Sequence, residues 1–177
     1  RLQPHRRAVR EVSRGAGLAR CARDQLRLLR LLEARRGAER RARGHLLLGS
    51  ESVLSGCSFV FNVADEDGGG LFVQNADVEI EGGFFDGNTA ANQGGAVKVV
   101  IGESVLSNCQ MTSNVANEGG GIYWFANAST IPLRVHGISI TGNTAISSGG
   151  GIKSRVAHPG VDLENATVCD NSPDQVS

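Results

Sequence analysis

Short runs of alternating apolar and polar residues fill the chain after residue 50. Val78-Glu79-Ile80-Glu81 is one such run, and its two-residue period is typical of a β-strand that buries one face. The region is rich in Gly, Asn, Val, Ile and Phe, which disfavours helices. Glycine and asparagine turns bound the runs. The pattern therefore predicts an all-β region built from short strands.

The strands recur in a repeat that is marked by one Asn in each copy, at steps of 26, 26, 29 and 28 residues. These residues form the structural Asn column: Asn62, Asn88, Asn114, Asn143 and Asn171. Three positions before each Asn stands an apolar residue: Phe59, Phe85, Met111, Ile140 and Val168. Eight positions before stands an aliphatic residue: Leu54, Ile80, Leu106, Val135 and Leu163. Two positions after stands Ala64, Ala90, Ala116 or Ala145, with Pro173 in the last copy.

Each of the first four copies then contains a glycine pair followed by an apolar residue. The pairs are Gly69-Gly70, Gly94-Gly95, Gly120-Gly121 and Gly150-Gly151. We expect these pairs at corners where a side chain does not fit or where φ must be positive.

A step of this length is too short for two helices with a linker, and it suits one coil of a parallel β-solenoid. We expect about three strands per coil and about four to five coils, stacked about 4.8 Å apart. The columns three and eight positions before the Asn would face the core. The Asn column would occupy a turn, where Asn tolerates the left-handed conformation and its amide bonds local backbone and its neighbours along the rod.

The repeat also resembles a known family. Phe59-Val60-Phe61-Asn62 and Phe85-Asp86-Gly87-Asn88 fit Phe-x-x-Asn, and Gly94-Gly95-Ala96-Val97 fits Gly-Gly-Ala-aliphatic. Over roughly residues 53–171 this resembles the repeats of chlamydial polymorphic outer membrane proteins and related right-handed parallel β-helix proteins of the pectin-lyase-like class. Met111, Ile140 and Val168 depart from the Phe, and Gly-Gly-Gly replaces Gly-Gly-Ala in some copies.

The resemblance implies a right-handed parallel β-helix that acts as a non-enzymatic scaffold or adhesin, extracellular or at the cell surface. No cofactor is expected. The expected partners are surface glycans or protein receptors, and further β-helix coils of a longer chain are another option.

The same fold hosts polysaccharide lyases and hydrolases. The alternative is therefore a carbohydrate-active β-helix, polysaccharide-binding or lyase-like, whose catalytic coils are missing or decayed. Such chemistry needs carboxylates in one outward column of neighbouring coils. The column seven before the Asn contains Ser55, Glu81, Ser107, His136 and Glu164. The column nine before contains Val53, Glu79, Val105, Arg134 and Asp162. No two adjacent coils share a carboxylate column, and an uncharged row separates Glu79 and Glu81 from Arg134 and His136. We therefore predict no catalytic residues.

Cysteines and histidines give no metal or disulfide signature. Cys57 and Cys109 share a column two coils apart, about 9–10 Å, which exceeds the reach of a disulfide. We expect both to be buried free thiols, whereas Cys21 and Cys169 have no visible partner. The four His residues lack metal-ligand spacing, so no metal site is predicted.

Two further features remain open. In Tyr123-Trp124-Phe125, alternation places Trp124 opposite its neighbours, and an outward aromatic there is either a sugar-stacking platform or packing under the longer loop at 126–133. Asn127 and Asn165 stand in sequons and are possible glycosylation sites.

The zero net charge conceals two unlike segments. Residues 1–50 contain 14 Arg, no Lys and 4 acidic residues, whereas residues 51–177 contain 4 basic and 14 acidic residues. We divide the chain into an Arg-rich N-terminal segment, 1–50, and the parallel β-helix repeats, 51–177. The first segment is a cap helix over Asp24 to Arg43, a disordered arm or a gene-model artefact.

The basic segment alters the expected partners little. No nucleic acid partner is expected, because no aromatic residue interleaves the Arg residues. No transmembrane segment is predicted and no signal peptide is visible, because no apolar run has the required length.

Overall fold

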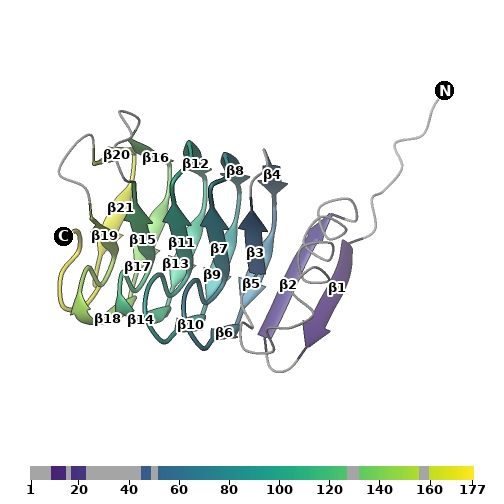
Figure 1. Ribbon diagram of the computed structural model, residues 1–177, viewed down its shortest axis with the longest axis horizontal. Helices are drawn as coiled ribbons and strands as arrows, with labels where there is room; N and C mark the ends of the chain where they lie inside the picture. Colours follow the sequence, from purple (N-terminus) through teal and green to yellow (C-terminus); the bar gives the residue numbers. More distant parts are fainter. Residues whose placement is uncertain (1–8, 15–16, 23–44, 49–51, 127–131, 156–159) are drawn as a thin grey trace.

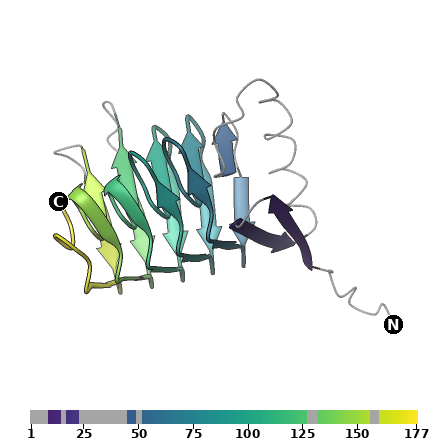
Figure 2. The same cartoon turned by 90° about the horizontal axis from the view of Figure 1, so that it is seen from below.

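The computed structural model describes residues 9–14, 17–22, 45–48, 52–126, 132–155 and 160–177, with side chains from residue 53 onward. The described residues from 45 onward form a parallel β-solenoid of about four turns, whose strands stack side by side along the long axis in Figure 1 and Figure 2. The predicted all-β parallel solenoid is thus confirmed. The helix predicted over Asp24 to Arg43 lies outside the described residues.

Four sheets run along the solenoid, and each full coil gives one strand to each of them. Sheet C contains β3 (His45–Leu48), β7 (Leu71–Gln74), β11 (Val97–Val100), β15 (Ile122–Phe125) and β19 (Ile152–Ser154). Sheet D contains β4 (Ser52–Ser55), β8 (Val78–Glu81), β12 (Ser104–Ser107), β16 (Leu133–His136) and β20 (Val161–Glu164).

The other two sheets follow in each coil. Sheet A contains β1 (Val9–Arg14), β2 (Gly17–Ala22), β5 (Ser58–Val60), β9 (Phe84–Asp86), β13 (Gln110–Thr112), β17 (Ser139–Thr141) and β21 (Thr167–Cys169). Sheet B contains β6 (Val63–Ala64), β10 (Thr89–Ala90), β14 (Val115–Glu118) and β18 (Thr144–Ser148). Among the described strands, all pairings are parallel except those of β2 with β1 and with β5.

The expectation of three strands per coil is wrong, because each full coil has four. The additional strand is the short one of sheet B, only two residues long in β10. It contains the alanine that follows each ladder Asn, and three of these alanines form a small buried cluster of their own: Ala64, Ala90 and Ala116. A strand of two residues, such as Val63–Ala64 or Thr89–Ala90, is too short to show the two-residue period, so the sequence pattern contained no strand signal there.

The predicted inward columns form the core. Phe59, Phe85, Met111 and Ile140 are fully buried, and so are the four aliphatic residues of the other column from Leu54 to Val135. The rings of Phe59 and Phe85 stack across coils, with centroids 4.8 Å apart and planes inclined by 8°. Burial ends with the last described coil, where Leu163 is 40 % exposed.

The glycine corners are as tight as predicted. A Cβ on Gly95 would lie 2.2 Å from the carbonyl oxygen of Gly120 in the next coil, so no side chain fits there. The residue before it, Gly94, has φ of +71°. Strand register equates Gly95 with Gly69, since Val97 pairs with Leu71. The pair in the second coil is therefore shifted by one position, and Ala96 takes the place of Gly70.

The left-handed residue at the Asn turn is not the Asn. In every copy it is the residue before the Asn: Phe61, Gly87, Ser113, Gly142 and Asp170. The expectation that the Asn column itself adopts this conformation is wrong. The physical reason is that the preceding residue makes the turn, which directs the Asn side chain inward.

Among the described residues, no helix has the length and apolar character needed to cross a membrane.

Candidate functional site

The Asn column forms a continuous hydrogen-bonded ladder inside the solenoid, as predicted. The side-chain amide of Asn88 donates to Oδ1 of Asn114 at 2.9 Å, and that oxygen also accepts the backbone N–H of Asn88 at 2.9 Å. The amide of Asn114 donates in turn to Oδ1 of Asn143 at 2.8 Å and to the carbonyl of Phe85 at 3.1 Å. All five residues of the column are buried. Their polar atoms are used within the fold, which gives them a structural role.

Sequence reasoning missed the residue that ends this ladder. Oε1 of Gln175 accepts the side-chain amide of Asn171 at 3.0 Å and its backbone N–H at 3.1 Å, while Nε2 of Gln175 donates to the carbonyl of Asn171 at 2.9 Å. Gln175 thus replaces the Asn of a next coil. It lies only four positions after Asn171, so the repeat spacing gave no signal for it.

The cysteine prediction is half right. Cys109 is a buried free thiol, and burial raises its pKa to about 11. Cys57, in contrast, is disulfide-bonded, so its prediction as a free thiol is wrong. The column spacing excludes only a bond between Cys57 and Cys109, and the two residues indeed form none. Cys169 is free and partly exposed.

The outer face of sheet D keeps the predicted columns in register. Glu81 pairs with Ser107, and Ser107 pairs with His136, so an uncharged row separates the acidic and basic rows. On its other side, however, His136 contacts an acid of the last coil, with Nδ1 2.8 Å from Oε2 of Glu164. This contact is exposed, and both residues stand in the column seven positions before the Asn.

The outer face of sheet C carries a buried cation that the sequence did not single out. Lys98 is 8 % exposed, and its Nζ lies 2.7 Å from Oδ2 of Asp67. The same nitrogen lies 5.3 Å from the ring centroid of Phe72 and 5.4 Å from that of Tyr123. Phe72, Lys98 and Tyr123 are paired neighbours on three successive coils. The ammonium is therefore held between two aromatic rings and neutralised by one carboxylate.

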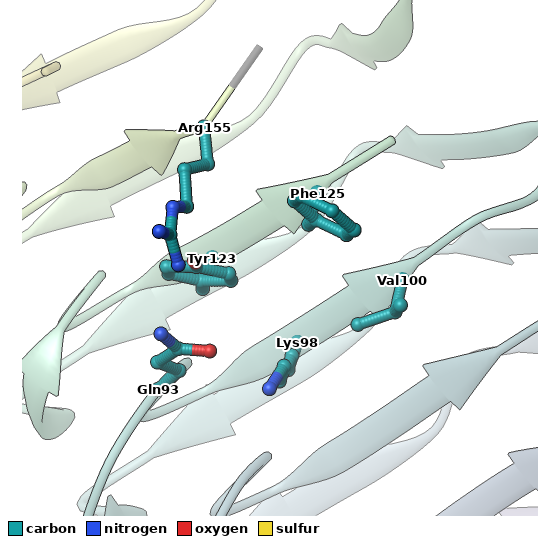
Figure 3. A pocket seen from close by; sticks show the side chains of 6 residues that line it. All are labelled: Gln93, Lys98, Val100, Tyr123, Phe125 and Arg155. Atoms are coloured by element: carbon teal, nitrogen blue, oxygen red, sulfur yellow. The ribbon is translucent and has the colours of Figure 1, made fainter. Parts of the chain in front are cut away.

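Beside this cation lies a hollow of about 160 Å³. Figure 3 shows the side chains that line it: Gln93, Lys98, Val100, Tyr123, Phe125 and Arg155. Lys98, Tyr123 and Phe125 come from β11 and β15, Gln93 comes from the turn before β11, and Arg155 follows β19. This hollow is the candidate functional site, because it gathers cationic, amide and aromatic groups on an outer face.

The guanidinium of Arg155 is exposed and forms a hydrogen bond with Tyr123. This hydrogen bond raises the pKa of Arg155 above its ordinary value. Gln93 is held by a hydrogen bond from its Nε2 to Oε2 of Glu118 at 2.8 Å. Asp67 and Glu118, the acids that contact Lys98 and Gln93, do not line the hollow.

Alternation at the aromatic run is as predicted. Trp124 is buried in the main core, while Tyr123 and Phe125 take the outer face. Tyr123 is only 1 % exposed, so its ring is not an open platform for a sugar. Phe125 is half-buried at the wall of the hollow. Most of the loop at 126–133 lies outside the described residues.

Asn127, the first of the sequon residues, lies outside the described residues. Asn165 is exposed in the turn between β20 and β21, with φ of +50°. Within the part of the chain that the structure describes, no three His, Cys, Asp or Glu side chains gather in a way that could hold a metal ion.

Comparison of the chain with protein-family models, with curated proteins and with solved structures finds no match.

Proposed function

We propose that this chain is a structural, adhesin-like β-helix segment that is displayed at the cell surface or outside the cell and performs no catalysis. The observation that carries the proposal is the contrast between its inward and outward columns. The inward columns repeat the same kind of residue from coil to coil and are buried in the first four copies of the repeat. The outward column nine before the Asn changes from Val53 through Glu79 and Val105 to Arg134 and Asp162. A constant interior with a varied exterior suits a rod that presents a binding surface along its length.

The state of Cys57 supports the proposed location. Cys57 is disulfide-bonded. Disulfides persist in oxidising compartments such as the cell exterior and are rare in the cytosol. The buried thiol of Cys109, with its raised pKa, is protected from oxidation there.

We also propose that the solenoid is right-handed and of the pectin-lyase-like class, with repeats of the polymorphic outer membrane protein type. The Phe-x-x-Asn and Gly-Gly-Ala-aliphatic motifs support this proposal. Parallel strands joined by crossover connections are right-handed in about 98 % of cases, which favours the same hand.

Surface glycans or protein receptors are the proposed partners. Beads coated with the full chain should attach to cultured cells more than beads coated with serum albumin do. The same protein, incubated with a panel of polysaccharides, should release no reducing ends and no unsaturated products. Attachment equal to the albumin beads would contradict the adhesive role, and any released product would contradict the non-catalytic one.

The carbohydrate-active alternative has one specific observation in its favour. His136 and Glu164 form a solvent-exposed contact of 2.8 Å on sheet D, and a histidine paired with a carboxylate is a common general base. If the polysaccharide panel does yield a product, the variant His136→Ala should abolish its release, whereas Lys153→Ala should not.

A further inference from the structure

The hollow on sheet C has the size of a single small ring. At about 160 Å³ it is well below the roughly 300–1,000 Å³ of pockets that enclose a whole drug-sized ligand. One wall is apolar, formed by Val100 and the half-buried ring of Phe125. The opposite wall carries Gln93 and Arg155, as Figure 3 shows. Such a hollow suits the terminal ring of a larger molecule whose remainder stays in solvent.

The charges at the hollow favour a ligand with a negative group. Both charged residues that line it, Lys98 and Arg155, are cations. Lys98 is already neutralised by Asp67 at 2.7 Å, so it contributes little to binding a second anion. Arg155 is exposed, and its five N–H donors exceed what its bond to Tyr123 uses. A guanidinium with free donors matches the geometry of a carboxylate.

We propose that this hollow binds the terminal carboxylate-bearing sugar of a cell-surface glycan. Arg155 holds the carboxylate, Gln93 bonds a ring hydroxyl or ether oxygen, and the ring of Phe125 packs against the apolar face of the sugar. The inference rests on the proposed adhesive function and names its ligand class. Glu118 lies near Arg155 and is already engaged with Gln93, so it keeps the affinity for an anion modest.

The test is a titration of the full chain with glucuronic acid and N-acetylneuraminic acid, followed by NMR shifts of backbone amides. We expect binding in the millimolar range, with shifts at Gln93, Tyr123 and Phe125. Arg155→Gln should weaken binding at least about tenfold, because charge-assisted hydrogen bonds to the carboxylate are lost. Arg155→Lys should recover part of the affinity, since it keeps the charge without the planar fork.

Lys153→Gln is the matched control. Lys153 is another cation of the same outer face, but it does not line the hollow. Its removal should leave the dissociation constant unchanged. Because Arg155 and Lys153 both lie outside the core, circular dichroism melts of both variants should match that of the unchanged chain.

The outcomes separate the two proposals. If glucose and galactose bound as tightly as the acidic sugars, the assignment of the carboxylate to Arg155 would be overturned. The same holds if Lys153→Gln weakened binding as much as Arg155→Gln. No binding of any sugar would overturn the site while leaving bead attachment intact. If the protein bound the sugars but its beads attached to cells no better than albumin beads, only the adhesive function would be contradicted.

Discussion

Gln175 accepts a hydrogen bond from the side-chain amide of Asn171, just as Asn171 accepts one from that of Asn143. Oε1 of Gln175 lies 3.0 Å from the side-chain amide of Asn171, and Oδ1 of Asn171 lies 2.9 Å from the amide of Asn143. The longer side chain of Gln reaches back from the tail and supplies the acceptor that a further Asn would supply. The ladder therefore ends without leaving a buried amide unsatisfied.

The variant Gln175→Ala should lower the free energy of unfolding by about 1–2 kcal/mol, because it leaves two buried donors of Asn171 without an acceptor. Chemical denaturation of the full chain measures the effect. Gln110→Ala removes a glutamine at an exposed position and is the control, with an expected change within about 0.5 kcal/mol. Equal losses in both variants would show that Gln175 does not complete the ladder.

A break in the middle of the ladder should cost more. Asn114→Ala removes the acceptor of two Asn88 donors and the donor to Phe85 and Asn143. Several buried groups then lose partners, so we expect a loss of about 3–5 kcal/mol in unfolding free energy. Asn92→Ala, at an exposed turn position, should be nearly silent in the same denaturation experiment. A loss below about 1 kcal/mol for Asn114→Ala would contradict a stabilising ladder.

Substitutions at two glycines separate the steric effect of an added Cβ from the effect of a positive φ. In Gly95→Ala the new Cβ would lie 2.2 Å from a carbonyl oxygen of the next coil, so the coils must shift, at a cost of about 3 kcal/mol. In Gly142→Ala nothing lies within 4 Å of the Cβ, and only its φ of +64° is unfavourable, at about 1 kcal/mol. Thermal unfolding should rank the two variants in that order. The reverse order would show that coil spacing adapts easily.

Ile101 offers a stabilising substitution. It adopts φ of +56°, which is unfavourable for a β-branched residue, and its partner in the preceding coil, Asn75, adopts φ of +50°. Ile101→Asn should raise the unfolding free energy by about 1 kcal/mol, measured as a higher denaturant midpoint at unchanged slope. Ile146→Asn is the control, since Ile146 is 77 % exposed and has no positive φ. A lower midpoint for Ile101→Asn would mean that its partial burial outweighs the backbone strain.

The thiol of Cys109 predicts a loss of stability in alkali. Burial raises its pKa from 9.0 to about 11, so the folded protein keeps the proton where the unfolded chain releases it. The protonated thiol therefore contributes about 3 kcal/mol to the free energy of unfolding. This contribution is complete below pH 9.0 and is lost as the pH rises toward about 11. Denaturation between these pH values should show a steeper decline for the unchanged chain than for Cys109→Ala. Parallel curves for the two proteins would contradict the assignment.

The sequence by itself determined the solenoid, its core columns and its Asn ladder. The reason is that a coil repeat sets each residue beside its own counterpart one step away, so Phe85 must meet Phe59 and Asn88 must meet Asn114. Alternation along one strand likewise placed Trp124 opposite Tyr123 and Phe125, but only the structure decided that Trp124 faces the core.

Only the tertiary structure decided the features that join different columns. The ion pair of Lys98 with Asp67 crosses from a strand to a turn, and Arg155 and Gln93 meet Tyr123 from separate elements. The cap by Gln175, the bonded state of Cys57 and the fourth strand were also decided there. Such contacts depend on how far each turn and side chain reaches in space, and a repeat spacing does not specify those distances.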